Sequence, residues 1–106
     1  METALKAIAA PRRRKILALV RDRELSAGEI AAHFDVTRPA VSQHLNVLKE
    51  AGLVNERRNG TRRLYSVRRE GLAPMLAFLE GFWDERLDAL VREAESEERR
   101  INADDD

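Results

Sequence analysis

The hydrophobic pattern of the chain changes its period once, just after Gly52. Up to Ala51, apolar residues recur every three or four positions, which is the spacing of helices that bury one face. Two β-prone runs, LVNERR and RRLYSV, then lie on either side of Asn59-Gly60. Asn-Gly is the strongest short-range signal for a two-residue hairpin turn. The pattern therefore predicts a mainly helical domain that carries one small β-hairpin.

Four helices are expected before the hairpin, over about residues 5–9, 11–22, 26–35 and 38–51. Pro11 suits the first turn of a helix, where its missing N–H would lack a partner anyway. Ser26 and Glu29 have the spacing of a capping box. Thr37 can cap the fourth helix, and Gly52 suits the position just after its end.

The hairpin turn fixes the expected register of the two strands. With Asn59-Gly60 as the turn, Glu56 faces Arg63 and Val54 faces Tyr65. Two helices joined by a tight turn and followed by such a ribbon indicate a winged helix-turn-helix.

One long helix is expected to close the chain, from about Pro74 to Arg99. Its apolar stripe recurs at helical spacing and would extend beyond a small domain, so it needs a partner. We expect a single domain over 1–106, divided into a DNA-binding part at about 11–69, a helix at about 72–99 that forms dimers, and an acidic tail at 100–106.

The net charge of zero hides an uneven distribution. Residues 1–69 hold 15 Lys and Arg but 7 acids, whereas residues 70–106 hold 4 basic and 12 acidic residues. A basic half of this kind is expected to attract a polyanion such as DNA. The alternative is that the arginines only solvate a helical surface.

The fourth helix has two faces on a helical wheel. Val41, Leu45 and Leu48 form its buried stripe. The outward arc carries side chains that pair with base edges, and the residues predicted to read bases are Arg38, Ser42, Gln43 and Asn46. Contacts to the DNA backbone or minor groove are predicted for Thr37, Arg13, Arg14, His44, Arg57, Arg58, Arg62 and Arg63.

Three stretches resemble the ArsR family of bacterial winged-helix repressors: APRRRKIL, the run from ELSAGEIAAHF through VSQHLNVLKEAGLV to RRLYSV, and FWDERLDAL. The resemblance covers about residues 4 to 95. It implies a homodimeric regulator of transcription, usually a repressor, whose first and last helices form the interface. The residues expected there are Leu5, Ile8, Leu76, Leu79, Trp83, Leu87 and Leu90. Two recognition helices related by a two-fold axis would meet an inverted repeat.

The chain departs from the metal sensors of that family. Their third helix carries a box with two cysteines, and Ser26 and Gly28 occupy those positions here. Neither side chain supplies the thiolate that a soft metal needs, and residues 74–99 contain no histidine. A carboxylate site at Asp84, Glu85 and Asp88 is a weaker alternative. Because thiolate and histidine ligands are missing from these positions, we expect no metal and no cofactor.

The sequence contains no G-x-S-x-G, P-loop or H-E-x-x-H pattern, and no enzymatic activity is expected. The absence of cysteine fits a cytoplasmic protein. No apolar run is long enough to span a membrane, so no membrane partner is expected. Two alternatives stay open. One is a winged-helix module that binds an acidic protein. The other is a repressor released by a small non-metal effector at the dimer interface.

Overall fold

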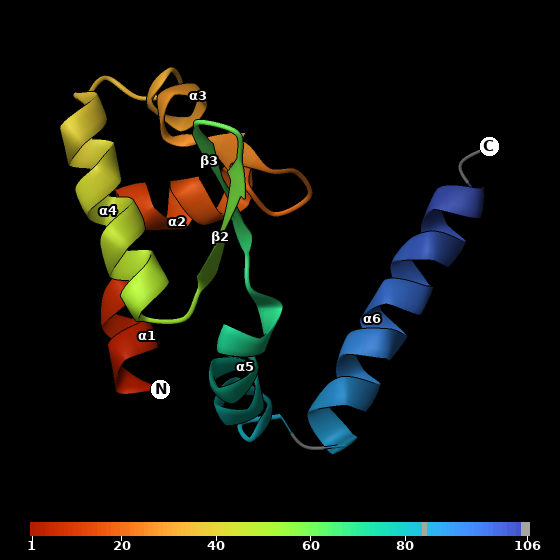
Figure 1. Ribbon diagram of the computed structural model, residues 1–106. Helices are drawn as coiled ribbons and strands as arrows, with labels where there is room; N and C mark the ends of the chain where they lie inside the picture. The colour runs from red at the N-terminus through yellow and green to blue at the C-terminus, as the bar shows by residue number, and fades with distance from the viewer. Residues whose placement is uncertain (84, 105–106) are drawn as a thin grey trace. The chain divides into compact units, whose positions relative to one another are not determined.

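The computed structural model describes residues 1–83 and 85–104, and the chain divides into two units after Met75. The elements of the first unit are α1 (Glu2–Ile8), α2 (Pro11–Leu19), β1 (Leu25–Ser26), α3 (Ala27–Ala31), α4 (Arg38–Glu50), β2 (Val54–Asn59), β3 (Arg62–Val67) and a 3-10 turn (Arg69–Gly71). Helix α5 (Ala73–Glu80) spans the division, and α6 (Glu85–Asp104) belongs to the second unit. Figure 1 shows this order along the chain. The winged helix-turn-helix predicted from the sequence is confirmed.

Helix α3 begins at a complete capping box. The Ser26 hydroxyl accepts a hydrogen bond from the Glu29 N–H at 3.2 Å, and Glu29 Oε1 accepts one from the Ser26 N–H at 3.0 Å. The helix ends at Ala31, earlier than expected, because the following N–H groups of His33 and Phe34 bond three residues back, as in a tight turn.

Helix α4 begins and ends as the sequence predicts. The Thr37 hydroxyl accepts a hydrogen bond from the Ala40 N–H at 3.3 Å. At the other end, Gly52 adopts φ of 75°, and the Leu53 N–H bonds the Leu48 carbonyl at 2.9 Å. This six-to-one bond is the Schellman arrangement, and its two apolar residues, Leu48 and Leu53, are fully buried.

The core of the first unit consists mainly of aliphatic side chains, which come from several of its helices and strands. Its largest fully buried side chains are Ile16, Val20, Ile30, Val41, Leu45, Leu48 and Leu53. Three of these come from α4 and occupy the stripe predicted for that helix. The opposite arc of α4 is consequently free to face outward.

The sheet differs from the expected two-stranded hairpin in two ways. The short strand β1 pairs with β3, which gives a three-stranded sheet in the order β1-β3-β2. The predicted register is wrong, because Glu56 lies opposite Tyr65 and Val54 opposite Val67. Asn59 pairs with Arg62, so the turn residues are Gly60 and Thr61, and only Gly60 has a positive φ. One positive φ at the first turn position is the requirement of a type II′ turn.

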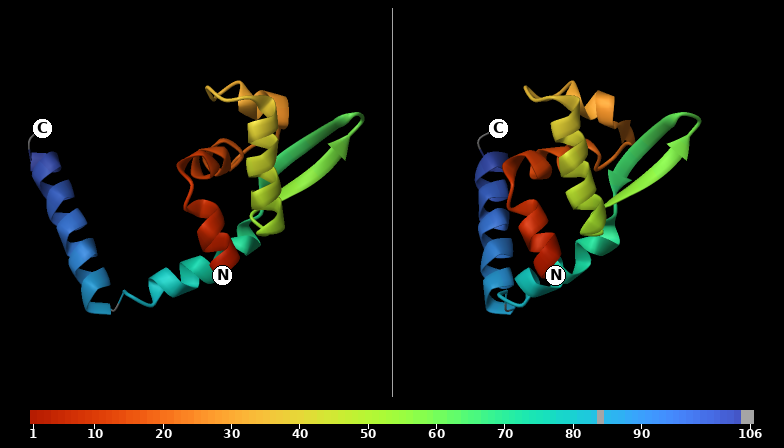
Figure 2. Two further views of the ribbon diagram at one scale, coloured as in Figure 1. Left: turned by 90° about the vertical axis from the view of Figure 1, so that its left-hand side faces the viewer. Right: turned by 60° about the vertical axis from the view of Figure 1, so that its left-hand side comes forward.

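Three elements of the first unit lie near one another at one of its ends. In the views of Figures 1 and 2, α3, the N-terminal end of α4 and the tip of the β2–β3 ribbon lie toward one side of this unit. These are the elements that a winged helix-turn-helix presents to DNA.

The long closing helix predicted over 74–99 is instead two helices, and this prediction was wrong. Near Gly81 the backbone bonds shorten to a three-residue span, with Phe82 N–H bonding the Leu79 carbonyl. Glycine is about 1 kcal/mol worse than alanine inside a helix, and the two aromatic residues after it are weaker helix formers than Leu or Ala. The interruption therefore falls where the local propensity is lowest.

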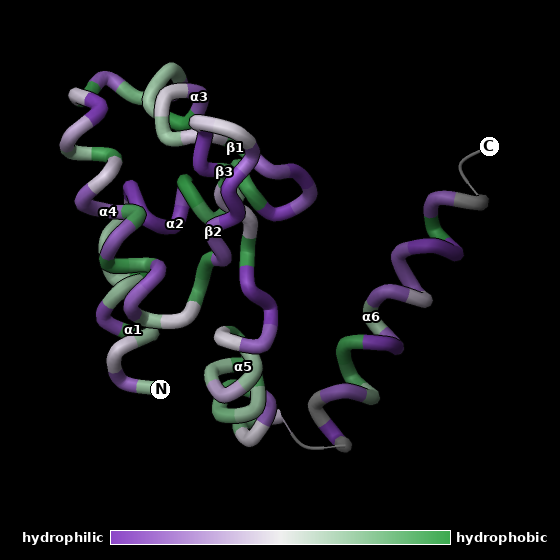
Figure 3. The backbone as a smooth tube through the Cα atoms, viewed as in Figure 1, coloured by the Kyte–Doolittle hydropathy of each residue, from purple (hydrophilic) through white to green (hydrophobic). Residues whose placement is uncertain are grey.

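Helix α6 continues to Asp104, beyond the predicted helix end at about Arg99 and into the segment expected to be an acidic tail. No glycine or proline interrupts residues 96–104, and Arg100 pairs with Glu97 one turn earlier. Figure 3 shows α5 mostly apolar and α6 alternating between polar and apolar segments. Among the described residues, no helix combines the length and the apolar composition that crossing a bilayer requires.

Candidate nucleic-acid interface

The outward arc of α4 is exposed as the wheel predicts. Arg38, Gln43 and Asn46 are exposed, and Ser42 is partly buried. Within the described residues, the Gln43 and Asn46 amides make no side-chain hydrogen bond, so both are available to another molecule. Their paired donor and acceptor atoms are the groups that recognise an adenine edge.

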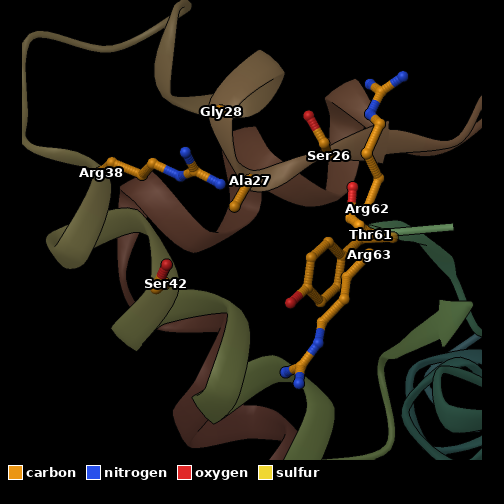
Figure 4. Close-up of a pocket in the computed structure, with 9 residues that line it drawn as sticks. Ser26, Ala27, Gly28, Arg38, Ser42, Thr61, Arg62 and Arg63 are labelled. Atoms are coloured by element: carbon orange, nitrogen blue, oxygen red, sulfur yellow. The ribbon is translucent and has the colours of Figure 1, made fainter. Parts of the chain in front are cut away.

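An open hollow lies between α3, α4 and the hairpin, as Figure 4 shows. Arg38 and Ser42 line it from α4, and Arg62 and Arg63 line it from the hairpin. The Arg38 guanidinium reaches across toward α3, where a Cβ on Gly28 would lie 3.8 Å from its Cζ. The hollow thus gathers three cationic side chains beside the proposed reading face.

The arginines of the hairpin are mostly paired with acidic residues of the same unit. Arg57 donates to Glu24 through Nε and Nη2, both at 2.9 Å. Arg62 pairs with Glu29, and Arg63 Nε lies 3.6 Å from Glu56 Oε1. Arg58 has no ion pair within residues 1–83 and 85–104.

Arg13 and Arg14 bind the C-terminal end of α1. Arg13 Nε donates to the Ala7 carbonyl at 2.5 Å, and Arg14 Nη1 donates to the Ile8 carbonyl at 2.7 Å. Cationic groups at the last carbonyls of a helix are favourable for its dipole. These two side chains therefore join α1 to α2, a structural role that the sequence did not reveal, and their contact with DNA stays a prediction.

His44 is partly buried on the flank of α4, where Arg13 Nη1 lies 3.4 Å from its Nδ1. Burial lowers the pKa of His44 below the ordinary value of 6.5, and the charges of Arg13 and Arg12 lower it further. A neutral ring can accept at Nδ1 from Arg13 and leave its Nε2–H as a donor. Arg13 thus links α1 and the recognition helix.

The residues predicted for the dimer interface lie in both units. On α1, Leu5 is exposed and Ile8 is partly buried against the core. In the C-terminal segment the exposed fraction is 57% for Leu79 and 63% for Leu90, and Leu76 and Trp83 are exposed to a similar degree. The side chain of Leu87 lies outside the described residues.

Among the described side chains, no group of three or more His, Asp or Glu is placed to hold a metal ion. The chain contains no cysteine. Asp84 and the Glu85 side chain, two members of the weaker carboxylate alternative, lie outside the described residues.

Two ion pairs of this surface, Glu24–Arg57 and Glu29–Arg62, were not predicted from the sequence. Glu24 and Glu29 each lie 33 positions before the arginine that they bind. No local pattern reports a contact across that separation. Pairing of β1 with β3 brings Glu24 and Glu29 near the hairpin, so a recognisable β1 would have indicated these contacts. A strand of two residues is too short to show the alternation of a strand in the sequence.

The helix-turn-helix, the outward polar arc and the basic ribbon together define a winged helix-turn-helix DNA-binding domain. The family described as "Bacterial regulatory protein, arsR family" matches the chain over residues 10–56. This match covers α2 through the start of the hairpin.

Two named relatives extend the match beyond those residues. "HTH-type transcriptional regulator Rv2034" of Mycobacterium tuberculosis is 42% identical over 96 residues, which cover 91% of this chain and 90% of the relative. "Transcriptional repressor SdpR" of Bacillus subtilis is 43% identical over 67 residues, which cover 63% of this chain and 74% of the relative.

Solved structures agree in fold. A crystal structure of a "Possible transcriptional regulator for arsenical resistance" aligns with a TM-score of 0.70 and 40% identity, over 88% of this chain and 96% of the other. A homodimeric winged helix-turn-helix domain of Mb0332 from Mycobacterium bovis aligns with a TM-score of 0.64 and 34% identity, over 74% and 73% of the two chains. The chain belongs to the ArsR family of DNA-binding transcriptional regulators, which are not enzymes.

Proposed function

We propose that this regulator is a homodimeric repressor that binds an inverted-repeat operator through α4. The observation that carries the proposal is the exposed arc of Arg38, Gln43 and Asn46 at the end of the unit that also carries the hairpin tip. Arg pairs with guanine and the two amides pair with adenine in the major groove. Ser42, half-buried beside them, adds a hydroxyl that suits either base type.

The hairpin and the flanking segments supply contacts to the DNA backbone. Arg58, at the exposed end of β2, carries a charge that no acidic side chain neutralises within the described residues. Arg63 has only a long ion pair, so it is also available. Thr37 at the start of α4, together with Arg13, Arg14 and His44, completes the proposed backbone set.

The dimer is proposed from exposed apolar side chains and from the homodimeric structure of Mb0332. Leu5 and Ile8 on α1 and the stripe of Leu76, Leu79, Trp83, Leu87 and Leu90 are the proposed contacts. Two copies related by a two-fold axis would place their recognition helices about one turn of DNA apart. That spacing is the basis for an inverted-repeat operator.

The response to a signal is proposed to be independent of thiolate-bound metal. Ser26 caps α3 with its hydroxyl, and Gly28 has no side chain, so the two sulfur positions of the metal-sensing members hold no soft donor. Release by a small non-metal effector at the dimer interface remains a second candidate. Its test is calorimetric titration of candidate ligands into the protein bound to its operator.

The direct test of base reading is selection of bound duplexes from a random pool, followed by mutagenesis. Gln43→Ala or Asn46→Ala should lose about 1–3 kcal/mol of discrimination at one base position. Arg58→Ala should weaken binding to all duplexes by the same factor. A reporter gene placed behind the selected operator then separates repression from activation.

The rival function is a winged-helix module that grips an acidic protein. It predicts that no sequence is enriched from the pool and that Gln43→Ala leaves duplex binding unchanged. Either result would remove the assignment of α4 as the base-reading element.

A further inference from the structure

Two acidic residues bind the arginines that the hairpin would otherwise offer to DNA. Both oxygens of Glu24 accept from Arg57, in a paired geometry with each distance at 2.9 Å. Glu29 accepts from Arg62 on the neighbouring strand while also completing the capping box of α3. The two pairs tie both strands of the hairpin to the segment that holds β1 and α3.

Both carboxylates are charged at neutral pH. The hydrogen bonds from Arg57 lower the pKa of Glu24, and the hydrogen bond from the Ser26 N–H lowers the pKa of Glu29. The side chains remain in contact with water, with Arg57 55% and Glu24 37% exposed. A DNA phosphate can therefore reach the same guanidinium groups.

Carboxylate and phosphate bind a guanidinium in the same two-point manner. Arg57 cannot keep both hydrogen bonds to Glu24 and also bind a phosphate through the same two N–H groups. We propose that Glu24 and Glu29 compete with DNA phosphates for Arg57 and Arg62, and so set the affinity of the protein for duplexes of every sequence. The inference rests on the proposed function, since it requires that the hairpin meets DNA.

The competition acts on backbone contacts and leaves base contacts alone. Gln43 and Asn46 carry no charge, and Arg38 makes no ion pair with Glu24 or Glu29 among the described residues. Releasing Arg57 should consequently tighten binding to specific and random duplexes by the same factor. The ratio between the two affinities should stay constant.

The test is the salt dependence of binding to a random-sequence duplex, measured for Glu24→Gln and for the matched control Glu70→Gln. Both substitutions remove one negative charge from an exposed side chain, but Glu70 has no ion pair within the described residues. Each arginine released to a phosphate should steepen the slope of log K against log salt by about 0.9. This corresponds to about an eightfold greater loss of affinity over a tenfold rise in salt.

A double-mutant cycle identifies the cause of any change. In an Arg57→Gln background, Glu24→Gln should no longer steepen the slope, because the arginine that it releases is absent. Glu29→Gln and Arg62→Gln form a second cycle, and glutamine at position 29 still completes a capping box.

Each outcome of these measurements decides the inference. Equal slopes for wild type, Glu24→Gln and Glu70→Gln would overturn it while leaving the proposed function intact. A Glu24→Gln effect that persists without Arg57 would also overturn it, because general repulsion would then be the cause. A wild-type chain that binds no duplex would overturn the proposed function as well.

Discussion

The two units of this chain differ in the burial of their large apolar side chains. In Met1–Met75 the large aliphatic side chains of α2, α3 and α4 are buried, and Ile16, Leu45 and Leu48 have no exposed surface at all. In Leu76–Asp106 the apolar side chains described are exposed, with Phe82 at 70% and Leu90 at 63%. A soluble chain rarely leaves so many large apolar groups in water unless another surface covers them.

The difference separates two sources of stability. The first unit contains its own core, capped helices and a sheet, so its fold is complete within one chain. The second unit has a periodic apolar stripe without an interior, which is the property of a helix that acquires its core by association.

Truncation of a buried residue in the first unit should have the largest effect. Leu45→Ala should lower the free energy of unfolding by about 2–5 kcal/mol, because it leaves a cavity among fully buried neighbours. Leu90→Ala is the matched truncation on exposed α6. Urea unfolding of both variants at a concentration that keeps the chain monomeric should show almost no loss for Leu90→Ala, and equal losses would erase the contrast.

Charges placed on the exposed stripe should act on association and not on the first unit. Leu79→Glu combined with Leu90→Glu should yield monomers by analytical ultracentrifugation, because a carboxylate is costly to bury at an apolar interface. The circular dichroism of the helices in the first unit should be retained. Ser96→Glu, at an exposed polar position of α6, is the control and should associate as the wild type does.

Removal of the α4 cap should have a smaller effect that is confined to the first unit. Thr37→Ala loses the hydrogen bond from the Ala40 N–H and should lower stability by about 1 kcal/mol. Thr61→Ala, in the exposed hairpin turn, removes the same hydroxyl without removing a cap. Thermal unfolding of the two variants should differ in melting temperature, with the Thr37 variant lower.

The smallest expected effect is the pH dependence caused by His44. Since burial lowers its pKa in the folded chain, the unfolded chain takes up the proton first as the pH falls. Stability should therefore decline as the pH drops from the ordinary value of 6.5 toward the folded pKa, and it should level off below that. His44→Gln should flatten this decline, as urea unfolding at a series of pH values would show.

Much of the first unit could be predicted from the sequence because its signals are local. The Ser26–Glu29 box, the Thr37 cap and the Gly52 terminus each lie within a few residues, and all three form as expected. The stripe of α4 follows from helical spacing alone. These features require no knowledge of distant parts of the chain.

The features that were missed depend on distant contacts or on small energy differences. The pairing of β1 with β3 joins residues about 40 positions apart, and the Glu24–Arg57 pair joins residues 33 apart. The turn could form at Asn59-Gly60 or at Gly60-Thr61, and moving it by one position changes every partner across the ribbon. The break near Gly81 depends on about 1 kcal/mol of helix propensity.

The base-reading roles of Arg38, Ser42, Gln43 and Asn46 are proposals that rest on the position of these residues on the outward arc of α4. The structure distinguishes the hairpin arginines by whether an acidic side chain already binds them. Arg58 is available without exchange of a partner, whereas Arg57 and Arg62 must first leave Glu24 and Glu29. A sequence alone could not rank these three arginines.

The proposal that two copies of the chain bind one inverted-repeat operator is tested most directly by the stoichiometry of the complex with a duplex selected from a random pool. Sedimentation equilibrium should give two chains per duplex, and nuclease footprinting should show two protected half-sites about one helical turn apart. One chain per duplex over a single half-site would contradict the proposal that α4 reads DNA while α1 and the second unit join two copies.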